Sequence, residues 1–391
     1  MMTEYKIKEI LRFHNGRGYD SISEQGLIPV YGSGGIMGYT DKSLLAGEYI
    51  LLPRKGSLNN YFYTNKPFWN VDTIYAADVI KDDVDCKYLY YYFKCLNLGN
   101  LDSGSTLPSM TQSAYGSIKV KLPSHDIQKK VSKFLTTIGN KISTNNKIIE
   151  TSEKLMREIY DYWFVQFDFP DENGRPYKSS GGEMVYDEKL KREIPKEWKV
   201  QNLLKNDLCE DIKPGIDKFD GAKTYYATAD VIDGEIGIGT QIDYDNRESR
   251  ANMQPRSNSI WFAKMKNSVK HITVMPTSDD LLEESVFSTG FFGLKCKSET
   301  LSYIRGFIYS DYFEKVKDLN SNGATMEAIS NDGVKNIKLI IPDKTTLEKY
   351  SSITNACLTQ NDILRKENAR LVSLRDWLLP MLMNGQVKIA D

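Results

Sequence analysis

The sequence predicts an α+β protein with two mixed α/β domains in a pseudo-twofold repeat, separated by two long antiparallel helices packed as a coiled coil. Three observations predict this fold class: an internal repeat, two long heptad patterns and a polar segment between the halves. A chain of 391 residues has room for two or three domains. The expected order is a first mixed domain (1–123), a first helix (124–167), a linker (168–194), a second mixed domain (195–342) and a second helix with a C-terminal tail (343–391).

The internal repeat lies at the end of each mixed domain. Residues 104–123 read GSTLPSMTQSAYGSIKVKLP, and residues 323–342 read GATMEAISNDGVKNIKLIIP. The two segments align without a gap, and the identical pairs are Gly104/Gly323, Thr106/Thr325, Ile118/Ile337, Lys119/Lys338 and Pro123/Pro342. Each copy ends in a β-like apolar run closed by proline. A repeat at this spacing predicts two domains of one fold.

A long helical pattern follows each copy of the repeat. The first begins after Pro123, with Ser124 or Asp126 available as the N-cap. Its apolar residues recur every seven positions, at Leu135, Ile142, Ile149, Met156 and Trp163. The second begins after Pro342, and its heptad positions are Tyr350, Cys357, Leu364, Leu371 and Leu378. Heptads of this length predict helices packed side by side, and two long helices in separate cores are the alternative.

The segments ahead of the helices mix both kinds of secondary structure. The β-rich pieces are Tyr49–Leu52, Ser259–Phe262 and Phe291–Leu294, and the shorter helical patterns lie at Lys87–Leu96 and Leu301–Leu319. The segment between the first helix and the second mixed domain is polar and rich in Gly, Pro and Ser, which predicts a loop or linker.

Composition limits the classes of function. Lys and Arg number 51 against 52 Asp and Glu, giving a net charge of −1, so any surface for nucleic acid must be local or completed by a partner. Five scattered cysteines without a CxxC pair predict free thiols in a reducing compartment. The sequence has no apolar signal core and no apolar run long enough to cross a membrane. We therefore expect a cytoplasmic protein.

Catalytic motifs are missing from the sequence. It has no Asn-Pro-Pro-aromatic or Asp-Pro-Pro-Tyr string and no P-loop, and the glycines at 32–35 and 237–239 lack the GxGxxG spacing. His14, His125 and His271 do not have the spacing of a metal or deaminase site. Asp82, Asp83 and Asp85 are expected to form a solvated acidic turn. We predict no catalytic residues and no metal ligands in this chain.

Two segments concentrate positive charge. The first lies between Glu48 and Asp72, a window without acids, and its candidate DNA contacts are Arg54, Lys55, Ser57, Asn59, Asn60 and Tyr61. The second spans 247–270, where six cations face the single acid Glu248, and its candidates are Arg247, Arg250, Asn252, Gln254, Arg256, Lys264, Lys266 and Lys270. Arg, Asn and Gln can pair with base edges, whereas Lys and Ser suit phosphates. An ordinary basic hairpin and a solvated basic face are the respective alternatives. Ser105, Thr106 and Thr325 are weaker candidates for phosphate contact.

The order of the segments, together with several short stretches of sequence, resembles the specificity subunit (HsdS) of type I restriction-modification systems over nearly the whole chain. The strongest pieces are IYDYW (159–163) with FDFPDENG (167–174), REIPKEW (192–198) and LRDWLLPMLMNG (374–385). The resemblance implies two target-recognition domains, each contacting one half of a bipartite site in double-stranded DNA. It also implies helices that separate these domains and dock methyltransferase (M) subunits.

The same resemblance implies that partners carry all the chemistry. The M subunits, expected in two copies, would transfer methyl groups from S-adenosylmethionine to adenine. Restriction/translocase (R) subunits would use ATP and Mg, so no cofactor is expected on this chain. A helix of about 36 residues is ~55 Å long at ~1.5 Å per residue, which can hold half-sites on the order of one to one and a half DNA turns apart. A stand-alone DNA-binding or anti-restriction adaptor and a divergent enzyme are the alternatives.

Overall fold

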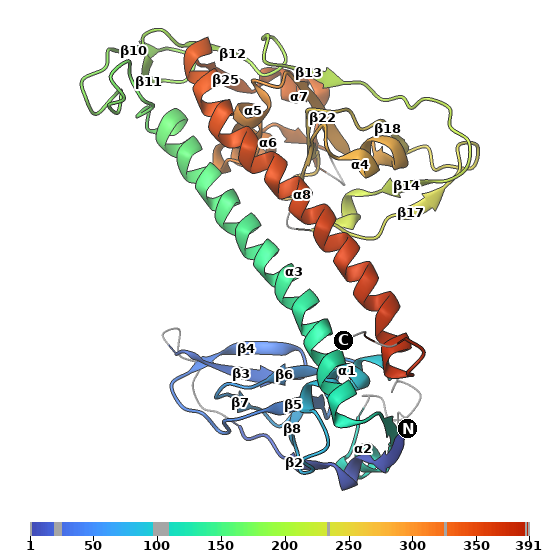
Figure 1. The fold of residues 1–391 in the computed structure, drawn as a ribbon. Coiled ribbons are helices and arrows are strands. Elements are labelled where there is room, and N and C mark those ends of the chain that lie inside the picture. The colour runs from blue at the N-terminus through green and yellow to red at the C-terminus, as the bar shows by residue number, and fades with distance from the viewer. Residues whose placement is uncertain are drawn as a thin grey trace. The chain divides into compact units, whose positions relative to one another are not determined.

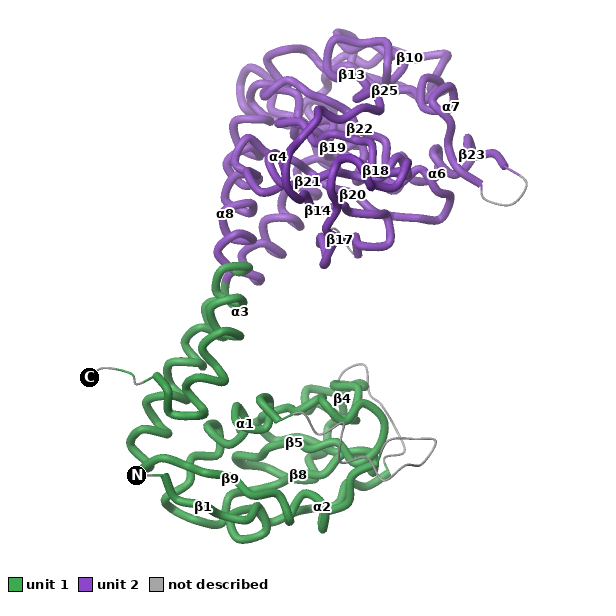
Figure 2. The backbone as a smooth tube through the Cα atoms, turned by 90° about the vertical axis from the view of Figure 1, so that its right-hand side faces the viewer, with its two compact units in different colours: residues 1–144, 368–391 green, residues 145–367 purple. Residues whose placement is uncertain are grey.

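The computed structural model describes residues 2–18, 26–96, 109–232, 235–323, 327–387 and 389. The chain forms two compact units (Figure 2). Unit 1 contains residues 1–144 and 368–391, and unit 2 contains residues 145–367. Each boundary between the units falls within a long helix, so each unit combines one mixed α/β region with parts of both helices.

The described part of unit 1 contains a four-stranded sheet, a three-stranded sheet and a two-stranded ladder (Figure 1). The four-stranded sheet is antiparallel and has the order β2 (Leu11–His14), β8 (Ile74–Val79), β5 (Tyr49–Pro53), β6 (Phe62–Thr64). The three-stranded sheet has the order β4 (Gly35–Thr40), β3 (Ile28–Gly32), β7 (Trp69–Asn70), and β3 runs parallel to β7. A separate ladder pairs β1 (Thr3–Lys6) with β9 (Lys119–Leu122).

Local sequence explains the helices of unit 1. A 3₁₀ turn, η1 (Ile7–Glu9), follows β1, and α1 (Cys86–Cys95) lies against β5 and β6. Asp85 caps α1 because its carboxylate accepts the Tyr88 N–H at 2.6 Å. Thr111 caps α2 (Gln112–Ser117) in the same way, through the Ala114 N–H at 3.1 Å. The expected solvated turn at Asp82, Asp83 and Asp85 therefore supplies a helix cap.

Unit 2 repeats this topology with additions. Its antiparallel sheet has the order β13 (Cys209–Ile212), β22 (Phe291–Cys296), β19 (Ser259–Ala263), β20 (His271–Val274). Its second sheet has the order β17 (Thr240–Ile242), β14 (Lys223–Tyr226), β21 (Ser285–Ser288), β18 (Ala251–Met253), with β14 parallel to β21. The ladder of β12 (Lys199–Asn202) and β25 (Lys338–Ile341) matches that of β1 and β9.

The remaining elements of unit 2 are short. The two small ladders are β15 (Val231–Ile232) with β16 (Glu235–Ile236), and β23 (Ser321–Asn322) with β24 (Ala328–Ile329). The helices are η4 (Thr228–Asp230), α4 (Asp279–Glu284), α5 (Leu301–Ile308), α6 (Asp311–Leu319) and α7 (Asn331–Asn336). Since α7 and β25 begin 219 residues after α2 and β9, the offset of the sequence repeat is kept in the structure. Gly104, Thr106, Thr325 and the candidate Ser105 lie outside the described residues.

The two heptad patterns form the long helices α3 (His125–Tyr160) and α8 (Lys344–Met383). A π-helical turn, η3 (Asp161–Val165), extends α3. In unit 2 the two helices run antiparallel, because Asn145 bonds to Glu367 whereas Trp163 packs on Tyr350, with ring centroids 5.7 Å apart. Gly385 has a φ of 69° and ends α8, and the Gln386 N–H donates to the Met381 carbonyl at 2.9 Å.

Each unit has a core that includes both long helices. In unit 1, Val131 and Leu135 of α3 share a buried cluster with Leu379 and Leu382 of α8. In unit 2, Met156 and Tyr160 of α3 share one with Leu347, Tyr350 and Leu358 of α8. The mixed regions complete both clusters, so the helices are part of the cores rather than separate rods.

Two segments differ from the sequence prediction. The predicted linker 168–194 overlaps a hairpin of β10 (Met184–Asp187) and β11 (Arg192–Pro195), and Phe169 stacks on Trp198 with centroids 4.7 Å apart. Phe169 and Tyr177 of this segment therefore pack into the core of unit 2. The helical pattern at Leu301–Leu319 is divided into α5 and α6, because the Ser310 hydroxyl accepts the Phe313 N–H at 3.2 Å and starts a new helix.

Candidate nucleic-acid interface

The first predicted contact segment is the loop between β5 and β6. Arg54 begins this loop: its N–H donates to the Thr73 carbonyl at 2.9 Å, and its carbonyl accepts the Met110 N–H at 2.9 Å. The guanidinium lies 5.9 Å from the centroid of the Tyr75 ring, and one of its nitrogens is 3.4 Å from the Asp72 carbonyl oxygen. The backbone of Arg54 is thus fixed, while its side chain is only half-buried.

Beyond Arg54 the loop turns outward. Lys55, Ser57 and Asn59 are exposed, and Gly56 allows the turn with a φ of 84°. Asn60 is half-buried because its side-chain amide donates to the Ser33 carbonyl at 3.1 Å. Lys55, Ser57 and Asn59 are therefore the candidates of unit 1 whose side chains are most open to a ligand.

Tyr61 does not lie on this surface. Its side chain is 5% exposed, its ring centroid is 5.8 Å from that of Phe93, and burial raises the pKa of its hydroxyl to about 12. The candidate assignment of Tyr61 to a DNA contact is corrected accordingly: the loop ends at Asn60, and Tyr61 begins the core. The absence of acids between Glu48 and Asp72 indicated a positively charged segment, but it gave no sign of which aromatic side chain is buried.

The first part of the second basic segment leads into β18. The Arg247 guanidinium lies 4.2 Å from the centroid of the Tyr244 ring, which holds it against the protein. Arg250 is exposed, and its carbonyl accepts the N–H groups of Asn252 and Thr289. Asn252 is half-buried, and its backbone carbonyl accepts the Gly215 N–H at 2.8 Å.

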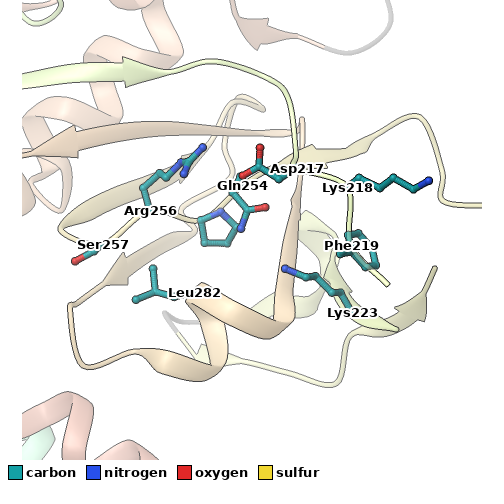
Figure 3. Close-up of a pocket in the computed structure, with 9 residues that line it drawn as sticks. Asp217, Lys218, Phe219, Lys223, Gln254, Arg256, Ser257 and Leu282 are labelled. Carbon is teal, nitrogen blue, oxygen red and sulfur yellow. The ribbon is translucent and has the colours of Figure 1, made fainter. Parts of the chain in front are cut away.

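Gln254 and Arg256 line a hollow of about 380 Å³ in unit 2 (Figure 3). The lining residues are Asp217, Lys218, Phe219, Lys223, Gln254, Pro255, Arg256, Ser257 and Leu282. Arg256 is exposed, whereas Gln254 is only 9% exposed. Three cations, one carboxylate, an amide and an aromatic ring thus border one polar depression, and its excess of positive charge suits nucleic acid. Lys218, Phe219 and Lys223 were not among the candidates, because they lie before the basic segment, which begins at Arg247.

The last three candidates border the loop between β19 and β20. Lys266 pairs with Glu327 at 2.7 Å, and the Lys270 ammonium donates to the Thr228 carbonyl at 2.6 Å. Lys264 is half-buried; burial lowers the pKa of its ammonium, and the charge of Arg250 lowers it further. Lys264 begins this loop, and Arg250, which precedes β18, is a like charge near it.

A buried network behind this loop was not predicted. Lys317 of α6 is 0% exposed, and its ammonium donates to the Ser268 carbonyl at 3.0 Å and to Glu314 at 2.6 Å. Glu314 also bonds to His271 at 2.8 Å, and the Asp318 carboxylate accepts the Asn267 N–H at 3.1 Å. These contacts fix the loop's backbone on α6. The sequence shows only the helical spacing of Glu314 and Lys317, because their loop partners lie about 45 residues earlier.

The predicted helix-packing residues divide into two groups. Those that are buried are Leu135, Ile149, Met156, Trp163, Tyr350 and Leu364, and those that are half-buried are Ile142, Cys357, Leu371 and Leu378. Polar residues also occupy the seam within unit 2. Asn145 and Asn361 are both 0% exposed, and their amides donate to Glu367 at 2.8 Å and to Glu153 at 3.2 Å.

Other kinds of site find little support in the described part of the chain. No three His, Cys, Asp or Glu side chains gather there as a metal ion would require. The five cysteines are free, and burial raises the pKa of the Cys209 thiol to about 12, which keeps it protonated. Among the same residues, no helix is both long and apolar enough to cross a membrane.

Comparison with known proteins relates the chain to one group. Residues 1–154 match the family model described as the type I restriction modification DNA specificity domain. The MjaIX specificity subunit of Methanocaldococcus jannaschii is 25% identical over 350 residues, which cover 85% of this chain and 74% of that protein. The HindI specificity subunit of Haemophilus influenzae is 22% identical over 340 residues, which cover 72% of each chain.

Similarity to solved structures extends over both units. The crystal structure of the type I restriction-modification S subunit from M. genitalium superposes with a TM-score of 0.66. The match covers 98% of this chain and 96% of that chain, at 17% sequence identity. At this identity the similarity establishes the fold, including both mixed regions and both long helices.

Proposed function

Because the chain belongs to the type I restriction-modification specificity subunits, we propose that it recognises the DNA target of such a complex. Each mixed α/β region is one target-recognition domain and contacts one half of a bipartite site in double-stranded DNA. The observation that carries this proposal is the duplicated topology, with a cationic loop between the third and fourth strands of the matching four-stranded sheets, β5 and β6 in unit 1 and β19 and β20 in unit 2. Two recognition domains of one fold suit a target made of two halves.

The chain acts as a recognition protein rather than as an enzyme. In our proposal, M subunits, in two copies, bind this chain and transfer methyl groups from S-adenosylmethionine to adenine. R subunits join through the complex and use ATP and Mg. The family assignment and the missing catalytic motifs support this division of labour.

The long helices set the distance between the half-sites in this proposal. α3 has 36 residues, so it is about 54 Å long at ~1.5 Å per residue. One turn of B-DNA is about 34–36 Å. Both helices contribute residues to both units, so in this proposal a change in their length changes the distance between the two half-sites.

Methylome sequencing tests the proposal directly. Cells that express this chain with a type I M subunit should gain adenine methylation at one bipartite motif, with two fixed halves and an unspecified spacer. Cells that express either chain alone should gain none. Methylation by the purified chain alone would instead indicate an enzyme. DNA binding that is unchanged by the M subunit, without complex formation on co-expression, would indicate a stand-alone adaptor.

A further inference from the structure

The cationic loops of the two units begin with the same backbone contact. Arg54 follows the last residue of β5, and Lys264 follows the last residue of β19. The Arg54 N–H donates to the Thr73 carbonyl at 2.9 Å, and the Lys264 N–H donates to the Gly290 carbonyl at 2.9 Å. Thr73 and Gly290 each directly precede a central strand, β8 or β22. Arg54 and Lys264 thus occupy matching positions relative to matching strands.

A second set of contacts fixes the same correspondence. The Arg54 carbonyl accepts the Met110 N–H at 2.9 Å, and the Lys264 carbonyl accepts the Ile329 N–H at 2.9 Å. The next residue of each loop forms a β-bridge, Lys55 with Ser109 and Met265 with Ala328. Both pairs of partners keep the offset of the internal repeat. The two loops were predicted from their charge alone. Their backbone contacts show that Arg54 and Lys264 occupy equivalent positions in the two units.

The surroundings of both side chains favour an anion. Within the described ranges of the chain, neither Arg54, Lys264 nor Arg250 forms an ion pair with a carboxylate. Arg250 lies next to Lys264, and a Cβ on Gly290 would lie 3.5 Å from its guanidinium. An anion between two neighbouring cations relieves their repulsion. Two neighbouring cations in unit 2, and one cation at the equivalent position in unit 1, therefore fit a phosphate group.

We propose that Arg54 and Lys264 are equivalent DNA-backbone contacts, each binding a phosphate at the same place relative to its own half-site. This inference rests on the proposed function and extends it to particular atoms. A contact made by the same position in both domains, whatever sequence each recognises, fixes orientation without reading bases. Base recognition then falls to residues farther along each loop, where the two units differ: Asn59 in unit 1 and Asn267 in unit 2.

The salt dependence of binding tests this assignment. The full chain, in complex with its M subunit, is titrated with its bipartite target and with an unrelated duplex between 50 and 200 mM KCl. Arg54→Gln and Lys264→Gln should each reduce the slope of log affinity against log salt by about 0.9. The affinity of the wild type falls by some factor between 50 and 200 mM KCl. For each variant this factor should be roughly 3.5 times smaller. The ratio of target to unrelated affinity should stay unchanged.

Conservative and distant substitutions serve as controls. Arg54→Lys and Lys264→Arg keep the charge and should keep the wild-type slope. Lys8→Gln in unit 1 and Lys205→Gln in unit 2 remove exposed charges that do not belong to the loops and should also keep it. An unchanged slope in Arg54→Gln or Lys264→Gln, or a change in the target ratio, would overturn the phosphate assignment. Failure of the wild-type complex to bind its target would instead refute the proposed function.

Discussion

The Lys317 ammonium is completely buried, and hydrogen bonds to fixed protein groups replace those that it would make to water. Glu314 at 2.6 Å supplies the opposite charge, and the Ser268 carbonyl at 3.0 Å accepts a further hydrogen bond. Removing one partner of a buried ion pair leaves the other charge uncompensated. Lys317→Met should therefore lower the free energy of unfolding of unit 2 by about 3 kcal/mol. Lys315→Met, at an exposed site on the same helix, is the matched control for urea denaturation. Equal stability of the two variants would show that the network does not stabilise the loop.

Glu153 gives unit 2 a pH-dependent component of stability. Burial alone would raise the pKa of this carboxyl, but the charge and hydrogen bond of Arg305, together with those of Arg365, lower it below the ordinary value of 4.5. A carboxyl with a lowered pKa in the folded state stabilises that state above its unfolded pKa. The contribution is lost as the pH falls below about 4.5 and through the folded pKa.

Glu153→Gln should make unfolding less dependent on pH in this acidic range. It should also reduce stability at pH 7, because Arg305 and Arg365 lose their counter-charge. Urea denaturation between pH 3 and 7, followed by tryptophan fluorescence, measures both effects. Glu150→Gln, exposed on the same helix, should follow the wild type. If Glu153→Gln retains the full acid dependence, the stabilising carboxyl lies elsewhere.

At the scale of single residues, charge and spacing predicted positions but not orientations. The sequence located Arg54 and Lys264 because cations accumulate without acids around them. The sequence prediction also placed Tyr61 on this surface. In the structure the Tyr61 ring is buried and lies against Phe93. Lys317 escaped prediction because its function depends on contacts with residues some 50 positions away, which no local pattern encodes.

Close packing of α5 against α3 explains a glycine within a helix. A Cβ on Gly306 would lie 2.2 Å from the Tyr160 ring, so an added methyl group requires the ring or the helix to move. Gly306→Ala should therefore destabilise unit 2 by about 1–3 kcal/mol, despite the better helix propensity of alanine. Gly139 of α3 has open space at the same position, so Gly139→Ala should stabilise by about 0.5–1 kcal/mol. Thermal denaturation of both variants should show midpoints that move in opposite directions. A rise in both would mean that Tyr160 yields at little cost.

At the scale of elements, the spacing of apolar residues predicted the long helices and several strands. The heptads predicted α3 and α8 because their apolar stripes persist for many turns, and β5 and β19 were predicted from short β-rich runs. The segment 168–194 was expected to be a linker because its composition is polar. Its few aromatic residues nevertheless carry the packing, since Phe169 lies between Tyr177 and Trp198. The average composition of a segment does not reveal a few packed aromatic side chains. It therefore could not predict a hairpin that these side chains hold in place.

At the scale of the whole molecule, the repeat in the sequence predicted the duplicated fold, although the boundaries between units could not be read from it. The compact units divide both helices, at residues 144/145 and 367/368, rather than at the ends of the mixed regions. This division follows from packing, because each mixed region buries the part of α3 and α8 nearest to it. A sequence pattern that continues through the boundary, as the heptads do, gives no sign of it.

The boundary between the units provides a precise place to change the length of both helices. Asn145 bonds to Glu367 at 2.8 Å, so positions 144/145 of α3 and 367/368 of α8 lie at one level of the helix pair. Inserting four helix-forming residues at both positions leaves the internal contacts of each unit in place. The helices then lengthen by about 6 Å, which corresponds to roughly one or two base pairs at ~3.4 Å each.

We expect methylome sequencing of cells that express this double insertion with the M subunit to show a longer spacer and unchanged half-sites. The half-sites should persist because both recognition domains are untouched, whereas the spacer follows helix length. The same four residues inserted after Gly174, in an exposed turn, should leave the spacer as it is. Altered half-sites at a constant spacer would show that the helices do not set the distance. Loss of all methylation would be separated from misfolding by comparing the thermal stability of the variant with that of the wild type: a stable but inactive variant would mean that the M subunits require the original helix length.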